Sequence, residues 1–134
     1  MSSLYFLDDT PVLEIIIRNP IMNKSFPSEG EVIAVLDTGF EGFLLIPKNV
    51  FEELSFNQFS VNQRKLILAN GLFTQSTGTF GEVIIPSLNL QLDGFIETIE
   101  GVEEIVIGTE LIKNLKLILD YCVGRIEAKN CKRL

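Results

Sequence analysis

The sequence predicts a mainly β fold, a partly closed barrel with two short helices, and three observations lead to this prediction. The chain has 134 residues, the length of one ordinary domain, so we expect a single domain over residues 1–134. Apolar residues make up 46% of the chain, and its Ile, Leu and Val residues gather in short runs that favour buried strands over amphipathic helices. Turn-forming Gly, Pro and Asn residues separate these runs at regular spacing, which is typical of barrels.

Apolar runs in the first third of the chain predict its first strands. A long turn over residues 19–30 separates the first two runs, because prolines and a glycine interrupt the apolar pattern there. The second run leads directly into the triplet Asp37-Thr38-Gly39. The strands expected in this part of the chain cover residues 12–17, 31–36 and 43–46.

Two short helices are expected. Pro47 opens the first, over residues 48–54, because proline is tolerated in a first helical turn and apolar residues recur there at helical spacing. Thr109 is expected to cap the second, over residues 110–115.

The dipeptide Asn70-Gly71 predicts a hairpin. It lies between two strand-like segments, residues 64–69 and 72–77, and both of its residues accept positive φ. A hairpin that only decorates the surface is the simpler interpretation, since the signal predicts the turn and not its use. The remaining strands are expected at residues 80–85, 88–92, 104–107, 117–121 and 125–128.

Composition excludes several classes of function. The net charge is -7 with no basic cluster, so we expect no nucleic-acid partner. No apolar run is long enough to cross a bilayer and the first residues do not form a signal peptide, so we expect a cytoplasmic protein without membrane partners. Cys122 and Cys131 are expected to be free thiols in a reducing compartment, and a bridge between them is the alternative.

Histidine is absent from the chain. This excludes Ser-His-Asp and Cys-His catalysis and any histidine-ligated metal. We therefore expect no metal and no cofactor, and carboxylates are the obvious acid–base groups left for an enzyme.

The triplet Asp37-Thr38-Gly39 has two interpretations. By itself it predicts a local turn, in which Asp37 accepts a hydrogen bond from its own backbone and Gly39 supplies a flexible φ. Its context favours a site, because an apolar strand feeds directly into it, and a second strand, a proline-led helix and a hairpin follow. Near the end of the chain, Ile105-Val106-Ile107-Gly108 leads into Glu110-Leu111-Ile112.

This ordered set resembles the retropepsin-like aspartic proteases, the retroviral-type single-domain enzymes, over about residues 12–128. The resemblance implies a closed barrel with a flap hairpin and a homodimer that cleaves peptide or protein substrates. It implies that Asp37 is catalytic, that Thr38 bonds across the dimer, and that Gly39 lets the loop backbone approach closely. It also assigns a set of residues to peptide binding: Phe40, Ala69, Asn70, Gly71 and Ile107.

The chemistry explains why two copies would be needed. Two carboxyl groups held about 3 Å apart cannot both ionise cheaply, so they share a proton and provide an acid and a base from identical side chains. The chain contains one such triplet, which supplies half of a site. The resemblance implies that a two-fold axis brings the second Asp37 to the first.

The sequence also departs from the viral pattern after the triplet. Phe40 and Glu41 stand where a small residue is usual, and we expect Phe40 to narrow the cleft and Glu41 to repel acidic substrates. Gly108 is expected either to start a helix or to lie beside the catalytic loop, where a side chain would intrude. The first function expected is an aspartic endopeptidase, and the alternative is a peptide-binding or dimerisation module with negligible catalysis.

Overall fold

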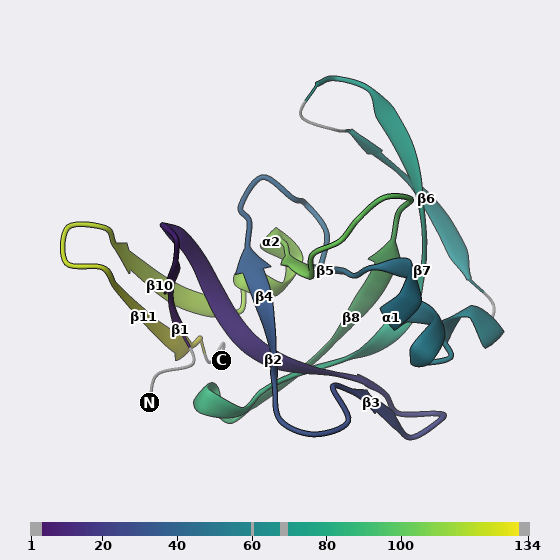
Figure 1. The fold of residues 1–134 in the computed structure, drawn as a ribbon, viewed down its shortest axis with the longest axis horizontal. Coiled ribbons are helices and arrows are strands. Elements are labelled where there is room, and N and C mark those ends of the chain that lie inside the picture. The colour runs from purple at the N-terminus through teal and green to yellow at the C-terminus, as the bar shows by residue number, and fades with distance from the viewer. Residues whose placement is uncertain (1–3, 60, 68–69, 132–134) are drawn as a thin grey trace.

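A computed structural model describes residues 4–59, 61–67 and 70–131 of the chain (Figure 1). Its main feature is a nine-stranded mixed sheet that bends into a ring. The strands follow one another across the sheet in the order β1-β2-β4-β9-β5-β8-β7-β6, and β3 pairs with β2. The prediction of a mainly β fold with two short helices is confirmed.

The long strand β2 (Thr10–Asn19) closes the ring. Its first half pairs with β4 (Val32–Leu36) and its second half pairs with β7 (Phe73–Ile85), so the sheet returns to its own starting strand. Leu13, Ile15 and Ile17 alternate along β2 and are fully buried, as expected when one face of a strand packs on the core. The other strands of the sheet are β1 (Leu4–Leu7), β3 (Lys24–Phe26), β5 (Leu44–Leu45), β6 (Asn62–Ile67), β8 (Leu90–Thr98) and β9 (Val106–Ile107).

Both helices pack on the ring. Helix α1 (Lys48–Glu53) buries Val50 and Phe51, two of the apolar residues that predicted it. Helix α2 (Thr109–Ile112) buries Leu111. The expectation that Thr109 caps this helix is wrong, because Thr109 is its first residue and the N-cap is Gly108, without a side-chain hydrogen bond.

The strand prediction erred most at β7. Two separate strands were expected at residues 72–77 and 80–85. The structure has one continuous strand, because Gly78 pairs with β6 on one side and with β8 on the other. A Cβ at Gly78 would lie 2.6 Å from the carbonyl oxygen of Ile96, so this glycine serves close packing and not a turn.

The C-terminal strands form a separate hairpin. Strands β10 (Leu115–Asp120) and β11 (Arg125–Asn130) pair with each other, and β1 lies beside β11. The ring of Phe6 on β1 contacts that of Tyr121 at a centroid distance of 4.5 Å. Cys122 and Cys131 are exposed free thiols, and the described helices include none long and apolar enough to span a bilayer.

Candidate active site

The segment that carries Asp37 connects two strands that are not neighbours in the sheet. β9 lies between β4 and β5, parallel to the first and antiparallel to the second. The loop over residues 37–43 therefore crosses the end of β9 to reach β5. Figure 1 shows this loop and the β6–β7 hairpin projecting on the same side of the molecule.

Backbone hydrogen bonds fix the start of the loop. The N–H of Asp37 donates to the carbonyl oxygen of Ile107 at 2.9 Å, and the N–H of Phe40 donates to that of Asp37 at 3.2 Å. The N–H of Thr109, at the start of α2, donates to the carbonyl oxygen of Phe40 at 2.9 Å. The position of Asp37 is thus set by backbone from the other end of the chain.

The side chain of Asp37 is exposed in the single chain, as are Thr38 and Gly39. Asp37 Oδ1 accepts a hydrogen bond from the N–H of Gly39 at 2.8 Å, which is the local turn that the triplet predicts by itself. The described lysines and arginines form no ion pair with Asp37. Asp37 therefore forms the local turn while its carboxylate stays exposed to solvent.

Gly39 and Gly108 are required for space. Neither has a positive φ, contrary to the expectation of a flexible φ at Gly39. A Cβ at Gly39 would lie 3.1 Å from Asp37 Oδ1, and one at Gly108 would lie 2.6 Å from the carbonyl oxygen of Phe40 and would collide with that of Gly42. Gly108 both starts α2 and lies against the loop, so the two interpretations of this residue hold together.

Phe40 is partly buried. Its ring covers Gly42 and Gly108, since ring atoms occupy the space that a Cβ at either glycine would need. The large side chain after the triplet therefore packs against its own loop, and this contact accounts for its size without placing it in the cleft.

The short strand β9 presents Val106 and Ile107 to opposite faces. Ile107 pairs with Leu36 and is fully buried in the core, so the structure argues against the expected contact of Ile107 with a peptide. Val106 pairs with Val35, and both are partly exposed beside Asp37. Val106 is thus the better candidate for peptide contact, and the alternation of a strand is the signal that identifies it.

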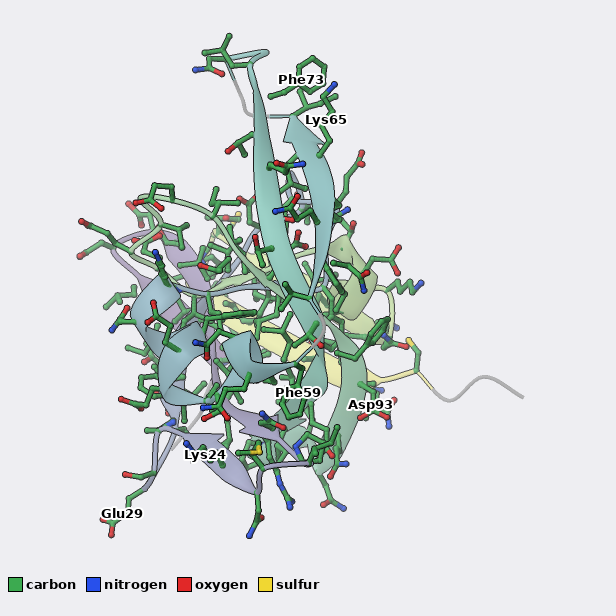
Figure 2. All side chains as sticks on the ribbon, turned by 90° about the vertical axis from the view of Figure 1, so that its right-hand side faces the viewer. Lys24, Glu29, Phe59, Lys65, Phe73 and Asp93 are labelled. Carbon is green, nitrogen blue, oxygen red and sulfur yellow. The ribbon has the colours of Figure 1, made fainter. Side chains whose placement is uncertain are left out.

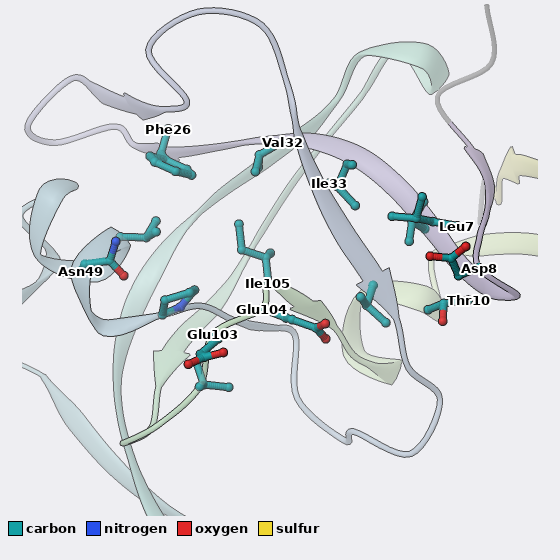
Figure 3. A pocket seen from close by; sticks show the side chains of 15 residues that line it. Leu7, Asp8, Thr10, Phe26, Val32, Ile33, Asn49, Glu103, Glu104 and Ile105 are labelled. Carbon is teal, nitrogen blue, oxygen red and sulfur yellow. The ribbon is translucent and has the colours of Figure 1, made fainter.

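A groove of about 680 Å³ lies next to Val35 (Figure 3). Its floor is apolar and includes Val12, Val32 and Ile105, whereas carboxylates of Asp8, Glu103 and Glu104 line it. The groove touches β4 at Val35, two residues before Asp37, and its lining includes neither the triplet nor a residue of the β6–β7 hairpin.

The predicted hairpin is present. The last described pair of the ladder is Ile67 with Phe73, and Leu72 lies outside strand β7. Gly71 has φ of 83°, as predicted, and the N–H of Leu72 donates to Asn70 Oδ1 at 3.0 Å. Ala69, also expected to bind peptide, lies outside the described residues.

The tip of this hairpin carries exposed apolar side chains. Ile67, Leu72 and Phe73 are each more than half exposed. Figure 2 shows Phe73 and Lys65 at the end of the hairpin, far from the body of the molecule, and Lys65 Nζ lies 4.2 Å from the centre of the Phe73 ring. Apolar side chains held this far from the core are typical of a surface that closes on something else.

Comparison with known proteins places this geometry in a known fold. The retroviral protease-like domain of Ddi1 from Leishmania major matches with a TM-score of 0.51 over 95% of this chain and 89% of that one, at 11% sequence identity. This chain has a retropepsin-like fold. An uncharacterized protein from Archaeoglobus fulgidus is 44% identical over 126 residues, covering 94% of this chain and 98% of that protein, and the chain belongs to one family with it. No family model matches the chain.

An ion pair that no local sequence pattern predicts lies beside the 37–43 loop. Arg64 on β6 and Glu97 on β8 form a two-pronged ion pair, with Nε–Oε1 and Nη2–Oε2 distances of 2.8 Å. The hydrogen bonds that Arg64 donates to Glu97 raise the pKa of Arg64, partial burial opposes this, and the nearby carboxylates of Glu97, Glu41 and Glu110 raise it further. Only the pairing of β6 and β8 with β7 brings the two residues together, so no local sequence signal marks them.

Proposed function

We propose that two copies of this chain form an aspartic endopeptidase, in which each copy contributes Asp37 to a pair of carboxyl groups. The observation that carries the proposal is the position of Asp37. It is exposed at the end of a buried strand, on a loop that backbone bonds from Ile107 and Thr109 hold in place. With one triplet per chain, a second carboxylate must come from a second copy.

The proposed chemistry needs no group beyond the two carboxyls and water. The ionised carboxylate takes a proton from water as the water oxygen bonds to the peptide carbonyl carbon, and the protonated carboxyl gives its proton to the carbonyl oxygen. The carboxyl that took the water proton then gives it to the nitrogen as the carbon–nitrogen bond breaks, and the other carboxylate takes a proton from a hydroxyl of the tetrahedral carbon, which leaves an amine, a carboxylic acid and the starting pair. The exposed hydroxyl of Thr38 is proposed to bond across the two-fold axis and fix the two loops.

Apolar surface on the terminal strands supports the proposed dimer. Leu7, Ile118, Tyr121 and Val123 are exposed and lie on β1, on β10 and in the turn that follows it. These elements lie side by side, and an apolar patch of this kind is typical of an interface between subunits. The β6–β7 hairpin is proposed to close over bound peptide, with Ile67, Leu72 and Phe73 contacting the peptide or the partner's hairpin.

Digestion of a peptide library at acid pH tests the proposal. We expect cleavage that a pepstatin-like inhibitor blocks, EDTA leaves unchanged, and Asp37→Asn abolishes with no loss of folding. Sedimentation of both proteins should give about twice the 15.0 kDa chain mass. Cleavage that persists in purified Asp37→Asn contradicts the proposal, and peptide binding without cleavage supports the binding module instead.

A further inference from the structure

The Arg64–Glu97 pair lies where three parts of the molecule meet. Glu97 has a side chain with 0% exposure, whereas that of Arg64 is 37% exposed. The backbone of Glu97 also holds β5, since the N–H of Ile46 donates to its carbonyl oxygen at 2.9 Å. The pair thus connects the first strand of the hairpin to the strand beside which the catalytic loop ends.

The sheet is built so that Arg64 can reach across β7. Arg64 pairs with Ser76, and Glu97 pairs with Gly78, which places all four residues on one face of the sheet. Ser76 is fully buried and Gly78 has no side chain, so the guanidinium passes over two small residues. A larger side chain at position 78 would collide with the ring of Phe95 and with the backbone at Ile96.

The 37–43 loop lies in direct contact with the Arg64–Glu97 pair. A Cβ at Gly42 would lie 2.6 Å from both Arg64 Nη2 and Glu97 Oε2. On its other side, the carbonyl oxygen of Gly42 accepts the N–H of Glu110 at 3.0 Å and lies in contact with Gly108. The end of the loop is therefore clamped between an ion pair and the start of α2.

Stability alone does not explain such a pair. Replacing a buried ion pair by apolar residues of similar size is often neutral or stabilising, whereas removal of one partner leaves a buried charge. A two-pronged arginine–carboxylate pair instead fixes geometry, because both planes must align for the hydrogen bonds to form.

We propose that Arg64 and Glu97 are positioning residues, which hold the 37–43 loop and the base of the β6–β7 hairpin in one fixed relation. The catalytic consequence rests on the proposed function, but the positioning itself does not. When the pair is broken, the loop loses the support under Gly42, and Asp37 and the hairpin no longer keep their mutual placement.

Hydrogen exchange and kinetics on the full-length protein test the proposal. Arg64→Lys is the first variant, because it keeps the positive charge and removes the two-pronged hydrogen bonding to Glu97. We expect the amides of Phe40, Thr109 and Glu110 to exchange about tenfold faster or more, while amides of β2 keep their protection. We also expect kcat to fall with little change in KM. Lys113→Met is the matched control, since it removes the exposed Glu110–Lys113 ion pair and should leave both measurements unchanged.

A second variant separates the effect of the pair on loop position from its effect on the stability of the fold. Arg64→Met with Glu97→Met replaces the pair by apolar side chains, and we expect it to unfold near the wild-type temperature while the loop amides still exchange fast. Unchanged loop exchange in Arg64→Lys overturns the proposal, and so does faster exchange spread evenly over β2. Fast loop exchange in a protein whose wild type cleaves no peptide supports the positioning role and contradicts only the proposed function.

Discussion

At the scale of single residues, the candidate site depends on backbone packed against backbone. Gly42 and Gly108 face each other across the loop, and both lie under the ring of Phe40. A side chain is excluded at Gly108 mainly because carbonyl oxygens of Phe40 and Gly42 occupy the space, and at Gly42 because side-chain atoms of Phe40, Arg64 and Glu97 do. Close steric contact therefore restricts the loop that carries Asp37, before any partner chain is considered.

Gly108→Ala tests this layer. The added methyl group would collide with the carbonyl oxygen of Gly42, so we expect a loss of unfolding free energy of roughly 1–3 kcal/mol and a larger loss of activity. Chemical denaturation and peptide cleavage measure the two effects. Gly30→Ala is the control, because φ of 74° strains an alanine there while the space around it is open, and activity should survive.

The sequence predicted those residues of the site that a pattern of consecutive residues identifies. A strand leading into Asp37-Thr38-Gly39, and Gly108 before a helix, are visible as consecutive residues. Ile107 was expected to bind peptide, whereas the structure buries it and leaves Val106 partly exposed, and a two-residue strand gives too short a pattern to predict these faces. Arg64 and Glu97 were missed because they are 33 positions apart and meet only across an intervening strand.

At the scale of elements, apolar patterns predict the long strands and the helices but not the short strands near the N-terminus. The apolar runs located β2, β4 and the helices, since burial on one face leaves a regular spacing. β1 and β3 were not predicted, because these short strands are held by pairing with β2 and not by patterns of their own. Strand ends shifted for the same reason, as in β8, which continues to Thr98 along its partner β7.

Gly71→Val tests the hairpin tip. Valine is strained at φ of 83°, so we expect the turn to distort and kcat/KM to fall about tenfold or more, with a small change in melting temperature. Gly30→Val is the matched control, because it places a similar strain at φ of 74° in the loop between β3 and β4. Equal kcat/KM in the two variants would indicate that the hairpin is only a surface turn.

The β1-β2-β4 surface predicts a pH effect on stability. Tyr5 Oη donates to Glu14 Oε2 at 2.8 Å, and Glu31 lies close to the same carboxylate. Desolvation first, and then hydrogen bonding and repulsion from Glu14, raise the pKa of Glu31. The folded state therefore holds the proton of Glu31 to higher pH than the unfolded state, and this residue lowers stability as pH rises.

Glu31→Gln should accordingly raise the melting temperature at pH 7, by a small amount because Glu31 is exposed. The gain should shrink as pH falls towards about 4, where the carboxyl is protonated in both states. Thermal melts from pH 4 to pH 7 measure it. Glu29→Gln removes the same charge two positions earlier, and an equal gain there would assign the effect to net charge.

At the scale of the whole molecule, the proposed activity depends on the assembly of two copies. Half of a carboxylate pair has no proposed chemistry, so the active fraction should follow the dimer fraction and depend on protein concentration. In the proposed dimer, the apolar terminal strands must outweigh the net charge of -7, which opposes association of two copies.

Ile118→Lys tests the terminal strands. Ile118 is 46% exposed and pairs with Glu127, so lysine is compatible with the hairpin but places a charge in the proposed interface. We expect a folded monomer in sedimentation, with cleavage that returns only at high protein concentration. Ile21→Lys, at another exposed isoleucine in the β2–β3 turn, should remain a dimer, and a dimeric Ile118→Lys would place the interface elsewhere.

The insertion of β9 between β4 and β5 has a consequence for the chain while it is being made. Translation delivers Asp37 early, but Ile105 and Ile107, whose carbonyl oxygens accept the N–H groups of Val35 and Asp37, come near the end. A nascent chain on the ribosome therefore carries the triplet without the backbone that orients it, and a product that stops before Ile107 never acquires it. Folding of the site must wait for this long-range pairing, so the carboxylate of Asp37 is oriented only after residue 107 has been made.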